Sequence, residues 1–169
     1  MPNPFGLKFG ETPGKKVAQY DVKFYCVPEA HPDFKEYSGQ WDPDRGLIQV
    51  SGVSKVFEND RFGEHSKTVY ERVKSQLSLK YGDHHDGEVL FVGSKNEDRK
   101  NFIKGIFDSD RRHSSSWASQ HGSDLDSSIC RIDLEILSSG IDRSWVEIIY
   151  SFTDDEDRGP DEIVGLSSL

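Results

Sequence analysis

The sequence predicts an α+β fold: an antiparallel sheet of about five or six strands with two helices packed on one of its faces. Two observations predict this class. In several short segments apolar residues alternate with polar ones, and in two longer segments they recur at helical spacing. The segments follow the order β-β-β-α-(β)-α-β-β, and the regular strand–helix alternation that builds a parallel sheet is not evident.

Two strands are predicted near the N-terminus. They follow residues 1–19, which are rich in glycine and proline and are interpreted as an N-terminal arm or edge strand. Alternation predicts the first strand over residues 20–27 and the second over residues 34–41. Cys26, and Cys130 near the C-terminus, fall on apolar parities, which predicts buried free thiols. A disulfide between them is the open alternative.

A tight turn and a third strand come next. Residues 42–46 read Asp-Pro-Asp-Arg-Gly, which is typical of a turn because proline fixes φ and glycine tolerates positive φ. The third strand is predicted over residues 47–57. A bulge is expected at Gly52, because the parity of the apolar residues changes there.

Two helices are predicted in the middle of the chain. The first covers residues 68–81, where Thr68 and Glu71 have the spacing of a capping box. Its apolar stripe recurs every fourth residue: Val69, Val73, Leu77 and Tyr81. The second helix is predicted to begin at Ser94, which has the same spacing to Glu97. Its apolar stripe is Phe102, Ile103, Ile106 and Phe107.

The last third of the chain combines a polar loop, a hairpin and an acidic tail. Residues 108–127 are rich in serine and are predicted to form a loop, with Trp117 as its anchor on the core. Two alternating runs over residues 128–152, separated by Ser-Ser-Gly, predict an antiparallel hairpin. Residues 1–152 are therefore expected to form a single domain, and residues 153–169 a disordered acidic tail.

The charge distribution limits the classes of partner. The chain carries a net charge of −9, and residues 153–169 contribute −5 of it through six acidic residues and one arginine. Binding to nucleic acid or to an anionic membrane requires a basic face, so neither partner is expected. A basic protein partner is compatible with this charge.

Outward-facing aromatic residues are the candidate contacts for such a partner. Trp145 and Ile149 fall on the parity opposite to the apolar set of the hairpin, so they face away from the predicted core unless a helix covers them. Trp41 is a further candidate, because tryptophan is enriched at the energetic centres of interfaces. The acidic residues expected to steer a basic partner follow the hairpin: Asp154, Asp155, Glu156 and Asp157.

One cluster, Asp83-His84-His85-Asp86, has the residue types of a metal site. Adjacent side chains diverge, and the histidine spacings of zinc motifs are absent, so a solvated loop after a helix is the favoured interpretation. Histidines also lie beside serines in the polar loop, but no nucleophile-elbow sequence accompanies them. Nucleotide-binding motifs are absent from the sequence, and no cofactor is predicted.

These observations favour a non-enzymatic protein-binding module, a small acidic inhibitor or immunity-type protein. Two alternatives stay open: a metal-assisted hydrolase that uses His84, His85 and Asp86, or a structural or assembly subunit. The sequence shows neither a secretory signal nor an apolar run of transmembrane length, so cytoplasmic localisation is expected. The sequence does not predict the oligomeric state.

Overall fold

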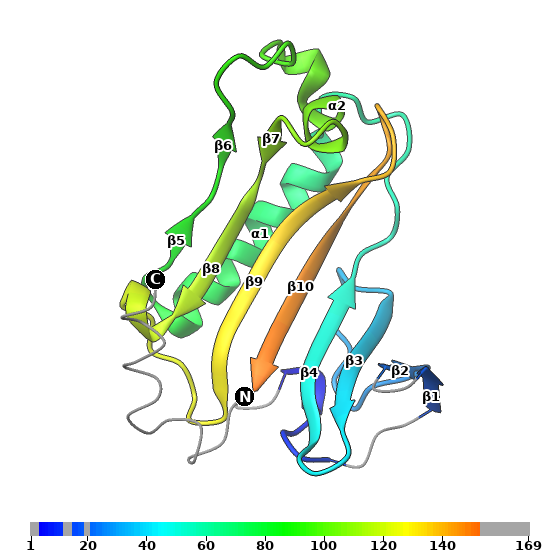
Figure 1. Cartoon of the computed structure of the whole chain (residues 1–169), viewed down its shortest axis with the longest axis vertical. Coiled ribbons are helices and arrows are strands. Elements are labelled where there is room, and N and C mark those ends of the chain that lie inside the picture. The colour runs from blue at the N-terminus through cyan, green and yellow to red at the C-terminus, as the bar shows by residue number, and fades with distance from the viewer. Residues whose placement is uncertain (1–3, 12–14, 19–20, 153–169) are drawn as a thin grey trace.

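The computed structural model describes residues 4–11, the backbone of residues 15–18, and residues 21–152, and its main feature is a long twisted antiparallel sheet (Figure 1). The sheet has eight strands in the order β1-β2-β3-β4-β10-β9-β8-β5. Their bounds are β1 Lys15–Ala18, β2 Asp21–Phe24, β3 Glu36–Asp42, β4 Gly46–Val53, β5 His85–Asp86, β8 Ser114–Ala118, β9 Ile129–Ser138 and β10 Ser144–Phe152. A separate small ribbon pairs β6, Val89–Leu90, with β7, Arg111–Arg112.

Both helices pack against the same buried face of the sheet, so the predicted α+β class is confirmed. The long helix α1 (Glu64–Tyr81) contacts β9 and β10, and the short helix α2 (Phe102–Phe107) contacts β9 and β7. In Figure 1 the strands β8, β9 and β10 lie in front of α1. The sheet exceeds the expected size because β8 and β5, in segments whose composition is typical of loops, extend it beyond β9.

The topology joins the N-terminal meander to the C-terminal hairpin in the middle of the sheet. Strands β1 to β4 form a meander, and β9 and β10 form a hairpin. β4 pairs with β10 in register from Gln49↔Ser151 to Val53↔Glu147. The chain between β4 and β9 crosses the buried face as α1 and returns at the sheet edge as β5 and β8.

The core lies between α1 and the central strands. One cross-strand row, Val50, Tyr150 and Ile132, joins β4, β10 and β9 on the buried face. The largest fully buried side chains among the described residues are Val22, Leu47, Val50, Tyr70, Ile103, Trp117, Ile129, Ile132, Leu134, Ile136, Val146 and Ile148. Because burying one large apolar side chain stabilises a fold by about 1.5–3 kcal/mol, this layer provides most of the favourable free energy.

The bulge expected at Gly52 is not there, and the prediction was wrong. β4 pairs regularly through Gly52 on both sides. The register shift lies instead where Gln40 and Trp41 of β3 face Gln49 and Leu47, so the extra residue is Ile48 of β4. Gly52 meets a different constraint: a Cβ there would lie 3.0 Å from the ring of Phe5 and 3.2 Å from that of Phe34. The glycine therefore leaves room for the aromatic rings that close this end of the core.

Helix α1 starts earlier than the sequence predicts, and its cap is a different residue. Thr68 lies inside the helix, where its hydroxyl donates to the carbonyl of Glu64 (2.7 Å). The carboxylate of Asp60 accepts hydrogen bonds from the N–H groups of His65 (3.1 Å) and Ser66 (3.3 Å), so it satisfies two free donors of the first turn. The predicted apolar stripe of this helix is buried, as expected.

Replacing Asp60 by alanine should destabilise the protein by about 1–2 kcal/mol, because the buried N-terminus of α1 loses its acceptor. Urea denaturation followed by circular dichroism measures the change. Asp60→Asn keeps an acceptor oxygen and should lose less than Asp60→Ala. Glu58→Ala, which removes only an exposed ion pair with Arg143, serves as the control. Equal loss in all three variants would contradict the capping role.

Helix α2 is shorter than predicted and begins later. The hydroxyl of Ser94 caps a local turn, and the helical region begins after Asp98, whose carboxylate accepts the N–H of Lys100 at 3.0 Å. The capping-box spacing at Ser94 therefore misplaced the start of the helix. Phe102 and Ile103 of the predicted stripe are buried, whereas Phe107 of the same stripe is 50% exposed.

Residues 108–127 are not the loop that their composition indicates. Ser114–Ala118 form β8, which pairs with β9 along its whole length. Trp117 is fully buried opposite Ile132, so it is part of the core itself. Ser115, only 1% exposed, is also on the buried face, and a serine inside the protein hides the alternation that would have predicted the strand.

The C-terminal hairpin is confirmed, but the predicted burial of the two cysteines was wrong. The register between β9 and β10 shifts after Ser151, so that Phe152 pairs with Ile129 and Cys130 falls at the irregularity. The shift reverses the parity of Cys130, which is exposed. Cys26 lies beyond the end of β2 and is exposed as well. Neither cysteine forms a disulfide.

Among the described residues, no helix combines the length and the apolar character needed to cross a membrane. The predicted acidic tail, residues 153–169, lies outside the described residues. The same holds for Asp154, Asp155, Glu156 and Asp157, which follow directly after β10 in the sequence.

Candidate functional site

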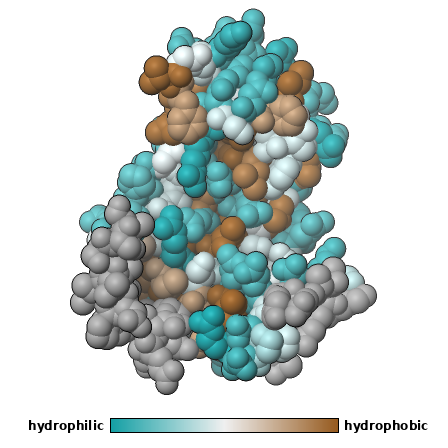
Figure 2. Space-filling model, in the orientation of Figure 1, coloured by the Kyte–Doolittle hydropathy of each residue, from teal (hydrophilic) through white to brown (hydrophobic). Residues whose placement is uncertain are grey.

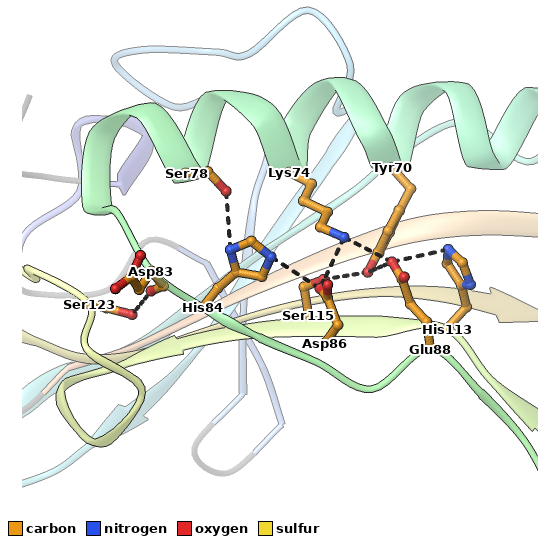
Figure 3. A network of polar contacts seen from close by, with 10 residues as sticks. All are labelled: Tyr70, Lys74, Ser78, Asp83, His84, Asp86, Glu88, His113, Ser115 and Ser123. Atoms are coloured by element: carbon orange, nitrogen blue, oxygen red, sulfur yellow. Dashed lines mark hydrogen bonds and ion pairs between the residues drawn. The ribbon is translucent and has the colours of Figure 1, made fainter.

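A network of polar side chains joins α1 to the sheet edge formed by β8 and β5 (Figure 3). Tyr70 Oη lies 2.5 Å from Ser115 Oγ and 3.1 Å from Glu88 Oε1. Ser115 Oγ donates to Asp86 Oδ1 at 2.6 Å. Lys74 Nζ forms ion pairs with Asp86 (2.9 Å) and with Glu88 (3.0 Å). The network thus holds β5 and the segment after it against the helix.

The protonation states in this network argue for a structural role. Burial raises the pKa of Tyr70 far above its usual range, so the phenol stays a neutral donor. Burial disfavours the charge on Lys74, but the hydrogen bonds to Asp86 and Glu88 outweigh it and raise the pKa of the amine. Tyr70 and Ser115 are both inaccessible to a substrate. Neither residue therefore has the exposure that general acid–base or nucleophilic catalysis requires.

The cluster of histidines and carboxylates singled out in the sequence does not converge on one point. His84 Nε2 lies 3.1 Å from Asp86 Oδ1, and its other nitrogen lies 3.3 Å from Ser78 Oγ. His85 turns the other way and stacks on His121, with ring centroids 5.2 Å apart. His85 and Asp86 are neighbours in the strand β5, so their side chains point to opposite faces. The structure therefore does not bring His84, His85 and Asp86 together around one point, as a metal-assisted hydrolase that uses these three residues would require.

The face of the sheet opposite α1 is turned toward the viewer in Figure 1, and no helix of the described chain packs on it. We call it the open sheet face, defined by outward residues of β3, β4, β9 and β10: Glu36, Ser38, Ser51, Val53, Asp133, Glu135, Leu137, Trp145, Glu147 and Ile149. In Figure 2, which has the same orientation, apolar and polar patches alternate over this side of the molecule. A half-apolar, uncovered sheet face is a candidate binding surface.

Two of the predicted contact residues lie on this face. Trp145 is half-buried and pairs across strands with Leu137, and Ile149 pairs with Asp133. Trp145 also lines a groove of about 410 Å³ together with Val53, Val56, Lys35, Glu36, Ser54 and Lys55. The expectation that Trp145 and Ile149 face away from the core therefore holds in the structure.

Trp41 is not brought to the open sheet face. It pairs across strands with Leu47, which is fully buried on the opposite face of the sheet. Directly opposed residues of an antiparallel pair share a face, so Trp41 lies on the side of the sheet that carries the core. Of the three predicted apolar contacts, the structure groups Trp145 with Ile149 and separates Trp41 from both.

The open sheet face also holds a pair of facing glutamates. Glu147 of β10 and Glu135 of β9 are directly opposite in the ladder, and both are half-buried. Burial raises the pKa of Glu147, and the charge of Glu135 raises it further. Arg112 lies 3.6 Å from Glu135, whereas Glu147 has no ion-pair partner among the described residues. Like charges in direct cross-strand contact destabilise a sheet, so this pair is a local weakness of the free protein.

Replacing Glu147 by glutamine should therefore stabilise the free protein by about 0.5–1 kcal/mol at neutral pH. A carboxyl whose pKa is raised on folding is disfavoured in its ionised form, so the penalty exists above that pKa and is relieved as the pH falls. Urea denaturation at about pH 7.5 and about pH 4.5 should show the advantage shrinking at the lower pH. Glu36→Gln, at the exposed end of the same cross-strand row, is the control. If Glu147→Gln is no more stable than the wild type at neutral pH, the two glutamates do not destabilise the free protein.

Comparison of the chain with known protein families, with curated proteins and with solved structures finds no match. The geometry of the open sheet face is therefore the basis for a functional assignment. Glu135 and Glu147 were not singled out in the sequence, although they share the parity of Trp145. The alternation of the two strands was the signal in the sequence that could have placed these glutamates on the outer face. The register of the hairpin, which places the two carboxylates opposite each other, was needed to recognise them as a pair.

Proposed function

We propose that this protein is a non-enzymatic protein-binding module, a small acidic inhibitor of the immunity type, whose open sheet face binds a basic segment of a partner protein. The observation that carries the proposal is Glu147: a half-buried carboxylate that faces Glu135 and has no cation beside it among the described residues. An arginine or lysine supplied by a partner would neutralise this pair. Binding would thereby relieve a strain that the free protein bears.

The apolar residues around the glutamates support the same reading. Trp145 and Ile149 lie on β10 on either side of Glu147 and on the same face. Aromatic anchors next to desolvated charges are typical of interface centres, and an aromatic ring also attracts a cation placed over its face. The surface therefore offers both the apolar contact and the charge that a basic segment would use.

The charge of the whole chain favours the same class of partner. The net charge is −9, and the acidic run Asp154–Asp157 follows directly after β10, the strand that carries Trp145 and Glu147. Long-range attraction of this kind raises the association rate more than the affinity. We further propose that the protein acts in the cytoplasm, where Cys26 and Cys130, which form no disulfide, would stay reduced.

The test is an affinity capture from a lysate of the source cells with the tagged protein, at low and at moderate salt, followed by mass spectrometry. We expect to capture a single basic protein in stoichiometric amount. Its binding should weaken as the salt concentration rises and should be lost in the Glu147→Lys variant. A captured protein that binds the Glu147→Lys variant equally well would show that the open sheet face is not the contact. Size-exclusion chromatography with light scattering tests the assembly alternative: concentration-dependent self-association lost in the same variant would mean that a second copy occupies the face.

A further inference from the structure

A second cluster of ionisable side chains lies away from the open sheet face, on the α1 side of the molecule. Glu71 of α1, Glu88 between β5 and β6, and His113 between β7 and β8 place one potential ligand atom each within 4.8 Å of one another. Three segments that are far apart in the sequence thus converge on one point. Figure 3 shows two of these residues, with Glu88 and the ring of His113 directed toward each other.

The ring nitrogen of His113 is the unusual atom of this cluster. His113 Nε2 is buried, has no hydrogen-bond partner, and lies 3.6 Å from Glu88 Oε1. The ring is fixed by aromatic neighbours, with centroids 4.6 Å from Tyr70 and 5.3 Å from Phe102. A buried polar atom without a partner is rare in folded proteins, and an ion or water is a common reason for its presence.

The surroundings of His113 favour the neutral form of its imidazole. Burial lowers its pKa to about 4; Glu88 opposes this effect, and Lys67, Lys74 and Arg111 add to it. The unpartnered Nε2 of His113 therefore offers a lone pair that can bind a metal ion.

The two glutamates have free oxygens for the same ion. The contacts of Glu88 with Tyr70, Lys74 and His113 all involve Oε1, so its second oxygen has no partner among the described residues. Glu71 is exposed and has no hydrogen bond or ion pair among the described residues, so the cluster is open to solvent on that side. The positive charge of Lys74 is shared with Asp86 and does not neutralise both glutamates.

From this juxtaposition we infer that Glu71, Glu88 and His113 form a binding site for a divalent transition-metal ion of the Zn²⁺ or Mn²⁺ class. One imidazole nitrogen and two carboxylates suit these ions, whereas Mg²⁺ and Ca²⁺ prefer oxygen ligands alone. Water would complete the coordination. The ion would connect α1 to the segment between β5 and β6 and to the segment between β7 and β8. It would thereby hold the edge of the sheet against the helix.

The test uses the full chain, stripped with a chelator and then titrated with Zn²⁺, Mn²⁺, Mg²⁺ and Ca²⁺ in separate calorimetric experiments. We expect one Zn²⁺ or Mn²⁺ ion per chain and a higher melting temperature with the bound ion. Glu71→Gln should weaken this binding by about tenfold or more without unfolding the protein, since Glu71 is exposed. Glu64→Gln, an exposed acid at the start of the same helix, is the matched control and should bind as the wild type does.

A spectroscopic readout connects the binding to His113. Co²⁺, used in place of Zn²⁺, should give visible absorption bands in the wild type that change in His113→Gln, provided that circular dichroism shows this variant to be folded. Binding that is equal in Glu71→Gln and Glu64→Gln would place the ion elsewhere and overturn the proposal. The absence of binding by any of the four ions, or preference for Ca²⁺ or Mg²⁺, would overturn it as well.

Discussion

Replacing Trp117 by alanine should lower the free energy of unfolding by about 3–5 kcal/mol, the largest stability effect expected for a single site in this chain. Trp117 is fully buried in β8, opposite Ile132 and with its ring centroid 5.1 Å from that of His84. Truncation removes the largest side chain of the core and leaves a cavity between the sheet edge and α1. For a domain of this size the loss should lower the melting temperature by about 10 °C or more.

A milder substitution separates packing from hydrogen bonding. Trp117 Nε1 has no hydrogen-bond partner among the described residues, so Trp117→Phe should retain most of the stability that Trp117→Ala loses. Urea denaturation measures both variants, and Leu79→Ala, which alters a side chain that is 90% exposed on α1, is the control. A loss below about 1 kcal/mol in Trp117→Ala would mean that residues 108–127 form a loop, as their composition indicates.

The contrast between the hairpin and β8 shows what the sequence can predict. In β9 and β10 the buried positions are almost all aliphatic or aromatic, so the alternation was visible and the hairpin could be predicted. In β8 one buried position is Ser115, whose hydroxyl is satisfied by Tyr70 and Asp86 from other segments. A buried serine with distant partners has no local signal, and the strand could not be recognised.

The same reasoning explains the errors at the ends of elements. Asp60 caps α1 from outside the helix, through a loop geometry that spacing rules do not describe. The capping-box spacing of Thr68 and Glu71 occurs inside the helix and has no capping function there. Cys130 lies at a register shift, and a single extra residue in a strand reverses the face of every residue before it.

The candidate site was predicted in part for a related reason. Parity alone assigned Trp145 and Ile149 to the outer face of the hairpin. Trp41 was proposed from its residue type alone, whereas its parity in β3 is that of the buried Tyr37 and places it on the other face. The facing pair of Glu135 and Glu147 required the ladder itself. A pair that destabilises the free sheet is the kind of local conflict that functional sites retain, and this gives the pair more weight than the half-buried Trp145 alone.

Replacing Trp145 by alanine should weaken the complex with the captured partner by about 30-fold or more, while changing the melting temperature of the free protein by only a few degrees. Trp145 is half-exposed on a face that no helix of the described chain covers, so truncation leaves no cavity in the core. Its anchoring role would appear in the dissociation rate, because interface contacts act mainly after encounter. Surface plasmon resonance with the purified partner measures both rates.

Charge reversal at the neighbouring position should have the larger effect and a different signature. Glu147→Lys places a cation where the partner is expected to supply one, so affinity should fall by about 100-fold, with a lower association rate and a weaker salt dependence. Glu147→Gln removes only the attraction and should fall between the wild type and Glu147→Lys, although it stabilises the free protein. Glu147→Gln should thus raise the stability of the free protein and lower its affinity for the partner, a combination that is specific to a binding role. If Trp145→Ala instead unfolds the protein, or if Leu79→Ala on the far side weakens the complex as much, the open sheet face is not the binding surface.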